Sequence, residues 1–294
     1  MLLVGTADGL LDLALDGTEE RRTLVGADVV AVSGDWAVAG GWLMALELGR
    51  PVDLPASLAP RCVLALPGGR ALVGTSDARL LEVGGPDGVR RDAAFDGVPG
   101  RARWSTPWGG PPDLRSLAVA GDRLYASVHV GGVWRRDATG WAQVVAAERD
   151  GHQVAASGTT VVVAAAVGVG QSDDGGDTWH WSDAGLHGPY CRAVAIADGW
   201  VLASASPGPG ATEGAVYRRP LREPRAPFTR CGGGGEGLPT SFARNVDTSE
   251  LAASGALAAV GTPEGDVHLS DDAGATWRRV AVALPGVRCV GFTS

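Results

Sequence analysis

The sequence contains no lysine, so all 25 of its basic side chains are arginines. We attribute this to the coding bias of a GC-rich genome rather than to function. The 33 acidic side chains outnumber the arginines and give a formal net charge of −8. This balance argues against a general nucleic-acid-binding or anionic-membrane-binding surface, and we predict neither kind of partner.

Long apolar runs and closely spaced cysteine pairs are also missing. No segment approaches the length needed to span a bilayer, and the first residues show no basic region followed by an apolar stretch. The four cysteines form no CxxC pair, which argues against a disulfide framework or a zinc site. We therefore expect a cytoplasmic protein with reduced, mostly buried thiols.

Glycine, in contrast, is abundant, with 45 residues, and there are 18 prolines. Without a collagen period, this composition indicates many turns, as in an all-β protein of many short strands. Apolar residues make up 45% of the 294 residues, which is enough for a sizeable core.

Two segments of the chain are nearly identical. They are Ser172-Asp-Asp-Gly-Gly-Asp-Thr-Trp179 and Ser270-Asp-Asp-Ala-Gly-Ala-Thr-Trp277, and both fit the pattern Ser-x-Asp-x-Gly-x-Thr-Trp. The pattern predicts a tight turn in which Ser and Asp bond local backbone, Gly adopts a conformation that other residues resist, and Trp caps the adjoining strand. Two copies indicate a repeat architecture. We expect both tryptophans to be largely buried and far from any ligand site.

A short strand with apolar residues at alternate positions recurs seven times along the chain. The seven segments begin at Asp28, Arg61, Arg115, His152, Arg192, Arg244 and Arg288. Dividing 294 residues by seven gives 42 per unit, a length that suits a four-stranded propeller blade. We therefore predict an all-β, seven-bladed β-propeller of four-stranded blades, with residues 1–294 forming one domain.

The two ends of the chain complement each other in this scheme. Residues 287–292 form a first strand with nothing after it, whereas residues 2–6 and 9–13 form a second and a third strand with nothing before them. We predict that the C-terminal strand joins the N-terminal blade and closes the ring, because closure removes exposed sheet edges.

The motifs and the repeat resemble the Asp-box (BNR-like) β-propeller superfamily. Its members include sialidase-type glycoside hydrolases, sortilin-type receptors and photosystem II assembly-factor propellers. The resemblance covers nearly the whole chain as a repeat pattern, but only the two Ser-x-Asp-x-Gly-x-Thr-Trp motifs are specific. Because those motifs are structural turns, the resemblance implies the fold and brings no activity with it.

The starts of the inner strands are the first candidate site. Propellers usually bind ligands at the mouth where these strands begin, and five of the seven starts are arginines, with His152 and Asp28 at the other two. The forked guanidinium suits carboxylate or phosphate, so five converging arginines predict an anion site. Alternatively, each arginine pairs with an acid of a neighbouring blade and latches the ring. The acids expected in that role are Asp8, Asp77, Glu264 and Asp28.

The sialidase-type resemblance implies specific catalytic groups: an arginine triad around a carboxylate, a Tyr/Glu nucleophilic pair and an Asp acid. This chain has no Arg-Ile-Pro motif near its N-terminus, and of its three tyrosines only Tyr190 precedes an inner strand. We therefore assign no catalytic residue, and we keep Tyr190 as a ligand contact.

The histidines are scattered, and His129, His152 and His187 map to the mouth side. No His-x-His or His-Glu-x-x-His spacing is present, so we predict no metal site, and we expect no cofactor. His152 and His187 are candidate ligand contacts.

Two insertions exceed the repeat length, at residues 96–113 and 206–214, and both are expected to overhang the mouth. The first carries Trp104 and Trp108, which we interpret as a lid or a partner contact because aromatic and arginine side chains anchor interfaces. The alternative is a loop held in place by its own aromatics.

Two functions fit these observations. The first is a non-catalytic binding or assembly propeller, a monomer whose arginine-rich mouth takes an anionic small molecule or an acidic segment of a partner protein. The second is an intracellular hydrolase or lyase acting on an anionic small molecule at the same mouth. A buried mouth acid with a raised pKa beside a histidine would favour the enzyme.

Overall fold

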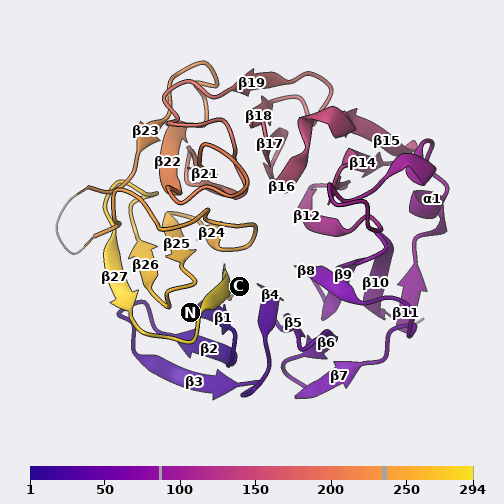
Figure 1. Ribbon diagram of the computed structural model, residues 1–294. Helices are drawn as coiled ribbons and strands as arrows, with labels where there is room; N and C mark the ends of the chain where they lie inside the picture. Colours follow the sequence, from indigo (N-terminus) through magenta and orange to yellow (C-terminus); the bar gives the residue numbers. More distant parts are fainter. Residues whose placement is uncertain (86–87, 234–236, 294) are drawn as a thin grey trace.

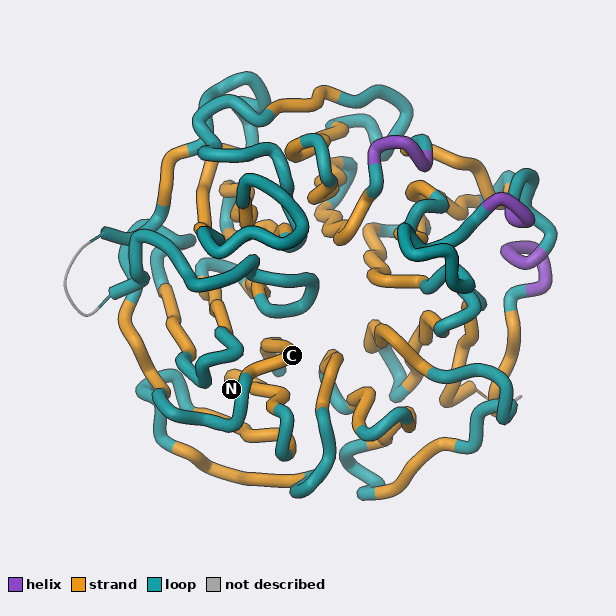
Figure 2. Tube along the Cα trace, viewed as in Figure 1, coloured by secondary structure: helices purple, strands orange, loops and turns teal. Residues whose placement is uncertain are grey.

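Seven four-stranded antiparallel sheets form a ring of blades around a central axis (Figure 1). The computed structural model describes residues 1–85, 88–233 and 237–293. Helical structure in these ranges is limited to α1 (Ala93–Asp96) and two 3-10 turns, η1 (Arg101–Arg103) and η2 (Ala147–Arg149). Figure 2 shows how loops alternate with strands around the ring. The predicted seven-bladed propeller is confirmed.

We letter the blades A to G in chain order and give their strands from the axis outward. Blade A contains β28 (Val287–Phe292), β1 (Leu2–Thr6), β2 (Gly9–Leu13) and β3 (Glu19–Thr23). Blade B contains β4 (Val29–Ser33), β5 (Trp36–Ala39), β6 (Trp42–Ala45) and β7 (Arg50–Val52). Blade C contains β8 (Pro60–Leu66), β9 (Arg70–Thr75), β10 (Leu80–Gly85) and β11 (Gly88–Arg91).

The other four blades follow the same order. Blade D contains β12 (Leu114–Ala120), β13 (Arg123–Val128), β14 (Gly132–Asp137) and β15 (Gly140–Val145). Blade E contains β16 (Gly151–Ser157), β17 (Thr160–Ala165), β18 (Gly168–Ser172) and β19 (His180–Ser182). Blade F contains β20 (Val194–Ala197), β21 (Trp200–Ala205), β22 (Ala215–Pro220) and β23 (Thr229–Arg230). Blade G contains β24 (Leu251–Ser254), β25 (Leu257–Gly261), β26 (Val267–Ser270) and β27 (Arg278–Ala281). None of the helical segments in the described ranges is long and apolar enough to cross a membrane.

Blade A is built from both ends of the chain, as the sequence predicted. Strand β28 pairs antiparallel with β1 from Leu2 opposite Phe292 to Thr6 opposite Val287. The ends are also tied directly, because the Thr293 backbone N–H donates to the Met1 carbonyl at 3.2 Å. In Figure 1 the C-terminus lies on the inner side of blade A, and the N-terminus lies beside it on the next strand outward. The ring therefore closes through hydrogen bonds between strands rather than through the continuous chain.

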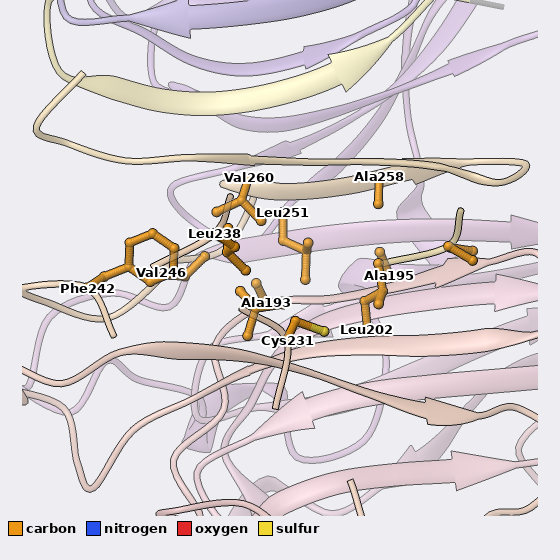
Figure 3. Close-up of a cluster of buried hydrophobic side chains, with 13 residues drawn as sticks. Ala193, Ala195, Leu202, Cys231, Leu238, Phe242, Val246, Leu251, Ala258 and Val260 are labelled. Carbon is orange, nitrogen blue, oxygen red and sulfur yellow. The ribbon is translucent and has the colours of Figure 1, made fainter. Parts of the chain in front are cut away.

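The core lies between neighbouring blades, and Figure 3 shows the cluster of buried side chains between blades F and G. The inner strands sit so close to the next blade that cysteine thiols reach its backbone: Cys62 Sγ donates to Leu114 O at 3.2 Å, and Cys289 Sγ to Val29 O at 3.4 Å. A Cβ on Gly74 would lie 2.6 Å from Cys62 Sγ, so this approach requires glycine on the second strand. All four cysteines are unpaired and buried.

The two Ser-x-Asp-x-Gly-x-Thr-Trp motifs form the same turn between the third and fourth strands of blades E and G. In blade E, Ser172 Oγ accepts from Gly176 N at 2.7 Å, and Asp174 Oδ1 accepts from Thr178 N at 2.9 Å. The hydrogen bonds from Thr178 and Ser172 hold the pKa of Asp174 well below its usual range. Gly176 has φ +98°, a conformation that disfavours any side chain.

Trp179 and Trp277 are half-buried rather than largely buried, which corrects the sequence prediction. Each ring lies along the edge of its turn, and its Nε1 donates to the motif glycine carbonyl, at 3.0 Å for Trp179 and 3.1 Å for Trp277. One side of each ring packs on the core between two blades. The other side faces solvent because the turn lies at the outer rim of the blade.

Replacing Trp277 by alanine is expected to cost about 2 kcal/mol of unfolding free energy, because only part of the ring is removed from water. Urea denaturation followed by circular dichroism measures the change. Trp42→Ala is the control, since Trp42 is 58% exposed and its loss should change stability little. Equal stability of Trp277→Ala and the wild type would show that the motif turn does not contribute to the core.

Candidate functional site

Irregular strand pairing determines where the side chains at the starts of the inner strands point. The ladder between the first and second strands skips one residue near the mouth in blades A to E, and the skipped residues are Arg288, Val30, Arg61, Arg115 and His152. Such β-bulges turn one side chain away from the regular alternation. Three arginines and one histidine therefore take the position at which blade B has Val30.

Arg192 and Arg244 reach the mouth differently. Strand β20 begins at Val194, so Arg192 lies two residues before it. Strand β24 begins only at Leu251, so Arg244 belongs to the preceding loop, and the predicted strand start at Arg244 is wrong. The alternation of residues 244–249 looks like a strand, but the segment is a loop that ends in a turn in which Glu250 N donates to Asp247 O at 3.0 Å.

Four of the five predicted arginines line one pocket of about 450 Å³ at the mouth. Blades A to D contribute Arg288, Val30, Arg61 and Arg115, and the loop before β24 contributes Arg244 on the other side. Within the described part of the chain, Arg192, His152 and Tyr190 do not belong to its lining. The acids of the lining are Asp113, Asp247 and Glu250.

Three of the mouth arginines are paired with carboxylates. Arg192 Nη1 lies 2.6 Å from Asp247 Oδ2, and Arg288 Nε lies 3.0 Å from Asp28 Oδ1. Both pairs join neighbouring blades, F to G and A to B. Arg244 pairs with Glu250 within blade G. The first two contacts have the form of the inter-blade latch that the sequence left open as an alternative, whereas Arg244 and Glu250 belong to the same loop before β24.

The acids of these pairs differ from most of those expected. Of the four predicted partners only Asp28 takes part. Asp77 pairs with Arg79, and Asp8 accepts from Gly26 N at 3.1 Å. Among the described residues, Glu264 forms no ion pair with a mouth arginine.

Arg61 and Arg115 differ from the other three arginines. Across residues 1–85, 88–233 and 237–293, neither forms an ion pair or a side-chain hydrogen bond. The carboxylate of Asp113 is influenced by the charges of both arginines, but its hydrogen bond is with His129, whose Nδ1 donates to it at 3.1 Å. Burial acts to raise the pKa of Asp113, but the His129 hydrogen bond and the charges of Arg115 and Arg61 lower it overall. The two guanidiniums therefore face the pocket from adjacent blades with free donors.

Glu250 is the most buried acid of the pocket, with 2% exposure. One carboxylate oxygen pairs with Arg244, and the other accepts from the Asp247 backbone N–H at 2.6 Å. Burial raises the pKa of Glu250 to about 7, although the Asp247 N–H and the Arg244 charge oppose the shift. This side chain therefore gains or loses a proton near neutral pH.

A second group of aromatic and polar residues continues the mouth toward blades E and F. The His152 ring is fully buried and donates through Nδ1 to Cys191 O at 2.7 Å, because a carbonyl can only accept. Its Nε2 lies 3.4 Å from both Asp150 Oδ2 and Tyr190 Oη. Arg192 in turn lies over the Tyr190 ring, 5.3 Å from its centroid. Tyr190 thus contacts both His152 and Arg192 and helps to position the arginine, and neither Tyr190 nor His152 belongs to the lining of the pocket.

His187 lies in a separate network on the loop before β20. Tyr217 Oη accepts from Arg230 Nε at 2.9 Å and lies 2.7 Å from His187 Nδ1, to which it donates because the imidazole proton is on Nε2. His187 Nε2 then donates to Glu213 O at 2.6 Å. Both ring nitrogens are hydrogen-bonded to the protein, so His187 helps to fix this loop, and its contact with a ligand stays a prediction.

The two tryptophans of the 96–113 insertion differ in burial. Trp104 is 8% exposed and packs against Phe95 and Trp134 at 5.6 Å between ring centroids, so the predicted lid residue belongs to the core. Trp108 is 76% exposed, and its ring forms a T-shaped contact with the His129 ring, with 5.3 Å between the ring centroids. Only Trp108 is available to a ligand or a partner.

No known protein family matches this sequence, and no curated protein matches it. The chain is similar in fold to solved propellers. A chain of the nidogen/laminin complex is 8% identical, with TM-score 0.55, covering 98% of this chain and 96% of that one. The computationally designed Ika8 protein is 16% identical, with TM-score 0.60 and coverage of 99% and 87%. An ancestral GH74 enzyme is 16% identical, with TM-score 0.57, covering 95% of this chain and 40% of the enzyme. Identities this low indicate a shared fold alone.

Proposed function

We propose that this propeller is a non-catalytic binding protein whose mouth holds an anionic group, a carboxylate or phosphate, between Arg61 and Arg115. The observation that carries the proposal is the contrast among the arginines. Arg192, Arg244 and Arg288 have carboxylate partners, whereas Arg61 and Arg115 have none in the described ranges and face a pocket of about 450 Å³. Two forked guanidiniums on adjacent blades suit bidentate recognition of an anion.

Binding is favoured over catalysis by the placement of the acids. Asp113 and Asp150, the acids beside histidines, have lowered pKa values and stay ionised, so neither supplies a proton at neutral pH. Glu250 has a raised pKa, but its bonds go to Arg244 and the Asp247 backbone. The combination of a proton-donating acid and a neighbouring histidine, which a hydrolase or lyase would need here, does not arise from these residues.

We also propose that the chain is a distant member of the Asp-box superfamily. The support is local: both motifs form the same turn, with the same Ser–Gly, Asp–Thr and Trp–Gly hydrogen bonds in blades E and G. The motif turns lie at the strand ends opposite the mouth, so this membership concerns the scaffold and not the site.

The anion site is tested by titrating glutarate and inorganic phosphate into the wild type and single variants, with affinity measured by calorimetry. Arg61→Met and Arg115→Met are each expected to weaken binding at least about tenfold, the loss that follows when a charged partner is removed. Their stability should equal that of the wild type, because no carboxylate is left without its partner.

Arg192→Met is the matched control at the same mouth. It leaves Asp247, which lines the pocket, without its partner, so it should lower the unfolding free energy by about 1–2 kcal/mol and weaken anion binding less than either Arg61→Met or Arg115→Met does. Anion affinity that is insensitive to Arg61 and Arg115, or the absence of binding by both probes, would refute the proposal.

A further inference from the structure

The mouth face is unusually apolar at its rim. Of the ten large apolar side chains that are exposed in the described ranges, six lie in the pocket, on loops at the mouth ends of the strands or, for Trp42, at the mouth end of β6: Val25, Val30, Trp42, Trp108, Val167 and Val282. This concentration is informative because exposed aromatics together with arginines mark protein interfaces. A free anion would contact the pocket only and would leave this rim in water.

Trp108 is the rim residue best placed to act with the pocket. Its ring forms a T-shaped contact with His129, His129 donates to Asp113, and Asp113 lines the pocket with Arg61 and Arg115. This series of contacts leads from the exposed indole to Asp113, which shares the lining of the pocket with the two arginines. A ligand that engages both the indole and the arginines must carry an apolar group next to its anion.

The loop that carries Trp108 is held rigid before any partner arrives. Thr106 N donates to Gly110 O at 3.1 Å, Gly109 N to Thr106 O at 2.9 Å, and Gly110 N to Thr106 Oγ1 at 2.9 Å. Gly109 has φ +79°, and prolines at 107, 111 and 112 flank the tip. A preorganised aromatic anchor loses little conformational entropy on binding, which raises the affinity gained per contact.

This inference rests on the proposed anion site. We infer that the ligand of that site is an acidic polypeptide segment. A Glu or Asp side chain of the segment enters the pocket between Arg61 and Arg115, and a neighbouring apolar side chain packs on Trp108. A peptide supplies both groups at a fixed spacing, whereas a small dicarboxylate or phosphate supplies only the first.

The probes are glutarate and a set of acetylated, amidated pentapeptides Gly-X-Glu-Z-Gly in which X and Z are Phe, Leu or Gly. For the wild type we expect the best apolar-flanked peptide to bind at least about tenfold tighter than the glycine-flanked peptide, as for a moderate aromatic hot spot. Trp108→Ser should bring this ratio close to one while leaving the Kd of the glycine-flanked peptide and of glutarate unchanged. Leu48→Ser is the control, because Leu48 is 65% exposed on a turn at the opposite face and should change neither value.

The outcomes separate the two proposals. If glutarate and every peptide fail to bind, the anion site itself is wrong. If glutarate and the peptides bind equally well, or if Trp108→Ser keeps the preference for apolar flanks, the ligand is a small anion and the inference is overturned. An eight-nucleotide thymidine oligomer that binds more tightly than the peptides would also overturn it, since it combines anions with planar groups on a different polymer.

Discussion

Deleting residues 287–294 is expected to abolish the cooperative melting transition. The deletion removes β28, whose Val287, Cys289 and Val290 are at most 4% exposed, and leaves β1 as an open edge. Burying a valine-sized side chain contributes about 1.5–3 kcal/mol, so three such side chains and a lost ladder exceed about 5 kcal/mol. That loss is comparable with the whole stability of many domains, and an open edge also invites aggregation.

The control for this deletion is a circular permutant that keeps every residue. The Thr293–Met1 backbone contact allows a short linker between the old ends, and new ends between Gly68 and Gly69 fall in a turn with open space around both glycines. The permutant should melt within about 5 °C of the wild type, because β28 and β1 then form an ordinary hairpin. A truncated chain that melts like the full chain would refute closure by β28.

Glu250→Gln is expected to change how stability depends on pH. In the wild type the folded protein holds the Glu250 proton up to a pH of about 7, whereas the unfolded chain releases it near the ordinary value of 4.5. Between these values the folded state binds more protons, so the unfolding free energy of the wild type falls as pH rises. The difference between the two pKa values corresponds to about 3 kcal/mol. The glutamine variant should lack this decrease and be more stable than the wild type above pH 7.

The measurement is urea denaturation of both proteins at half-unit pH intervals from 4.5 to 8.5. Glu264→Gln is the control, since Glu264 is an exposed acid on the same face and should reproduce the wild-type profile. Parallel profiles for Glu250→Gln and the wild type would mean that Glu250 is already ionised in the folded protein at acid pH.

The blades could be predicted from the sequence because their signal is periodic. Each inner strand repeats an apolar alternation, with an average of 42 residues per blade, and the incomplete sets of strands at the two ends fit together only as one blade. The one misplaced strand, at residues 244–249, has the right alternation but the wrong surroundings. The inner strand of blade G begins instead at Leu251, after a turn in which Glu250 N donates to Asp247 O. Alternation alone does not distinguish an extended loop from a strand.

The mouth could be predicted only in part. The arginines stand out as a recurring residue type, but their partners depend on loop geometry. Asp113, Asp247 and Glu250 lie within a few residues of mouth arginines in the sequence, yet the second-to-third loops were the expected source of acids. The β-bulges that aim Arg61, Arg115 and Arg288 leave no mark in the residue pattern, and burial of Trp104 depends on its contact with Trp134 from blade D.

The four buried cysteines give the ring a built-in set of reporters. Cys62 lies at the boundary of blades C and D, Cys191 at that of E and F, Cys231 at that of F and G, and Cys289 at that of A and B. Burial raises the pKa of Cys62 and Cys191 to about 12 and that of Cys231 to about 11, so the intact boundaries suppress the reactive thiolate. A thiol reagent therefore reacts only when a particular pair of blades separates. The labelling rate of each cysteine then measures the free energy of that one opening, at four of the seven boundaries, without any engineered probe.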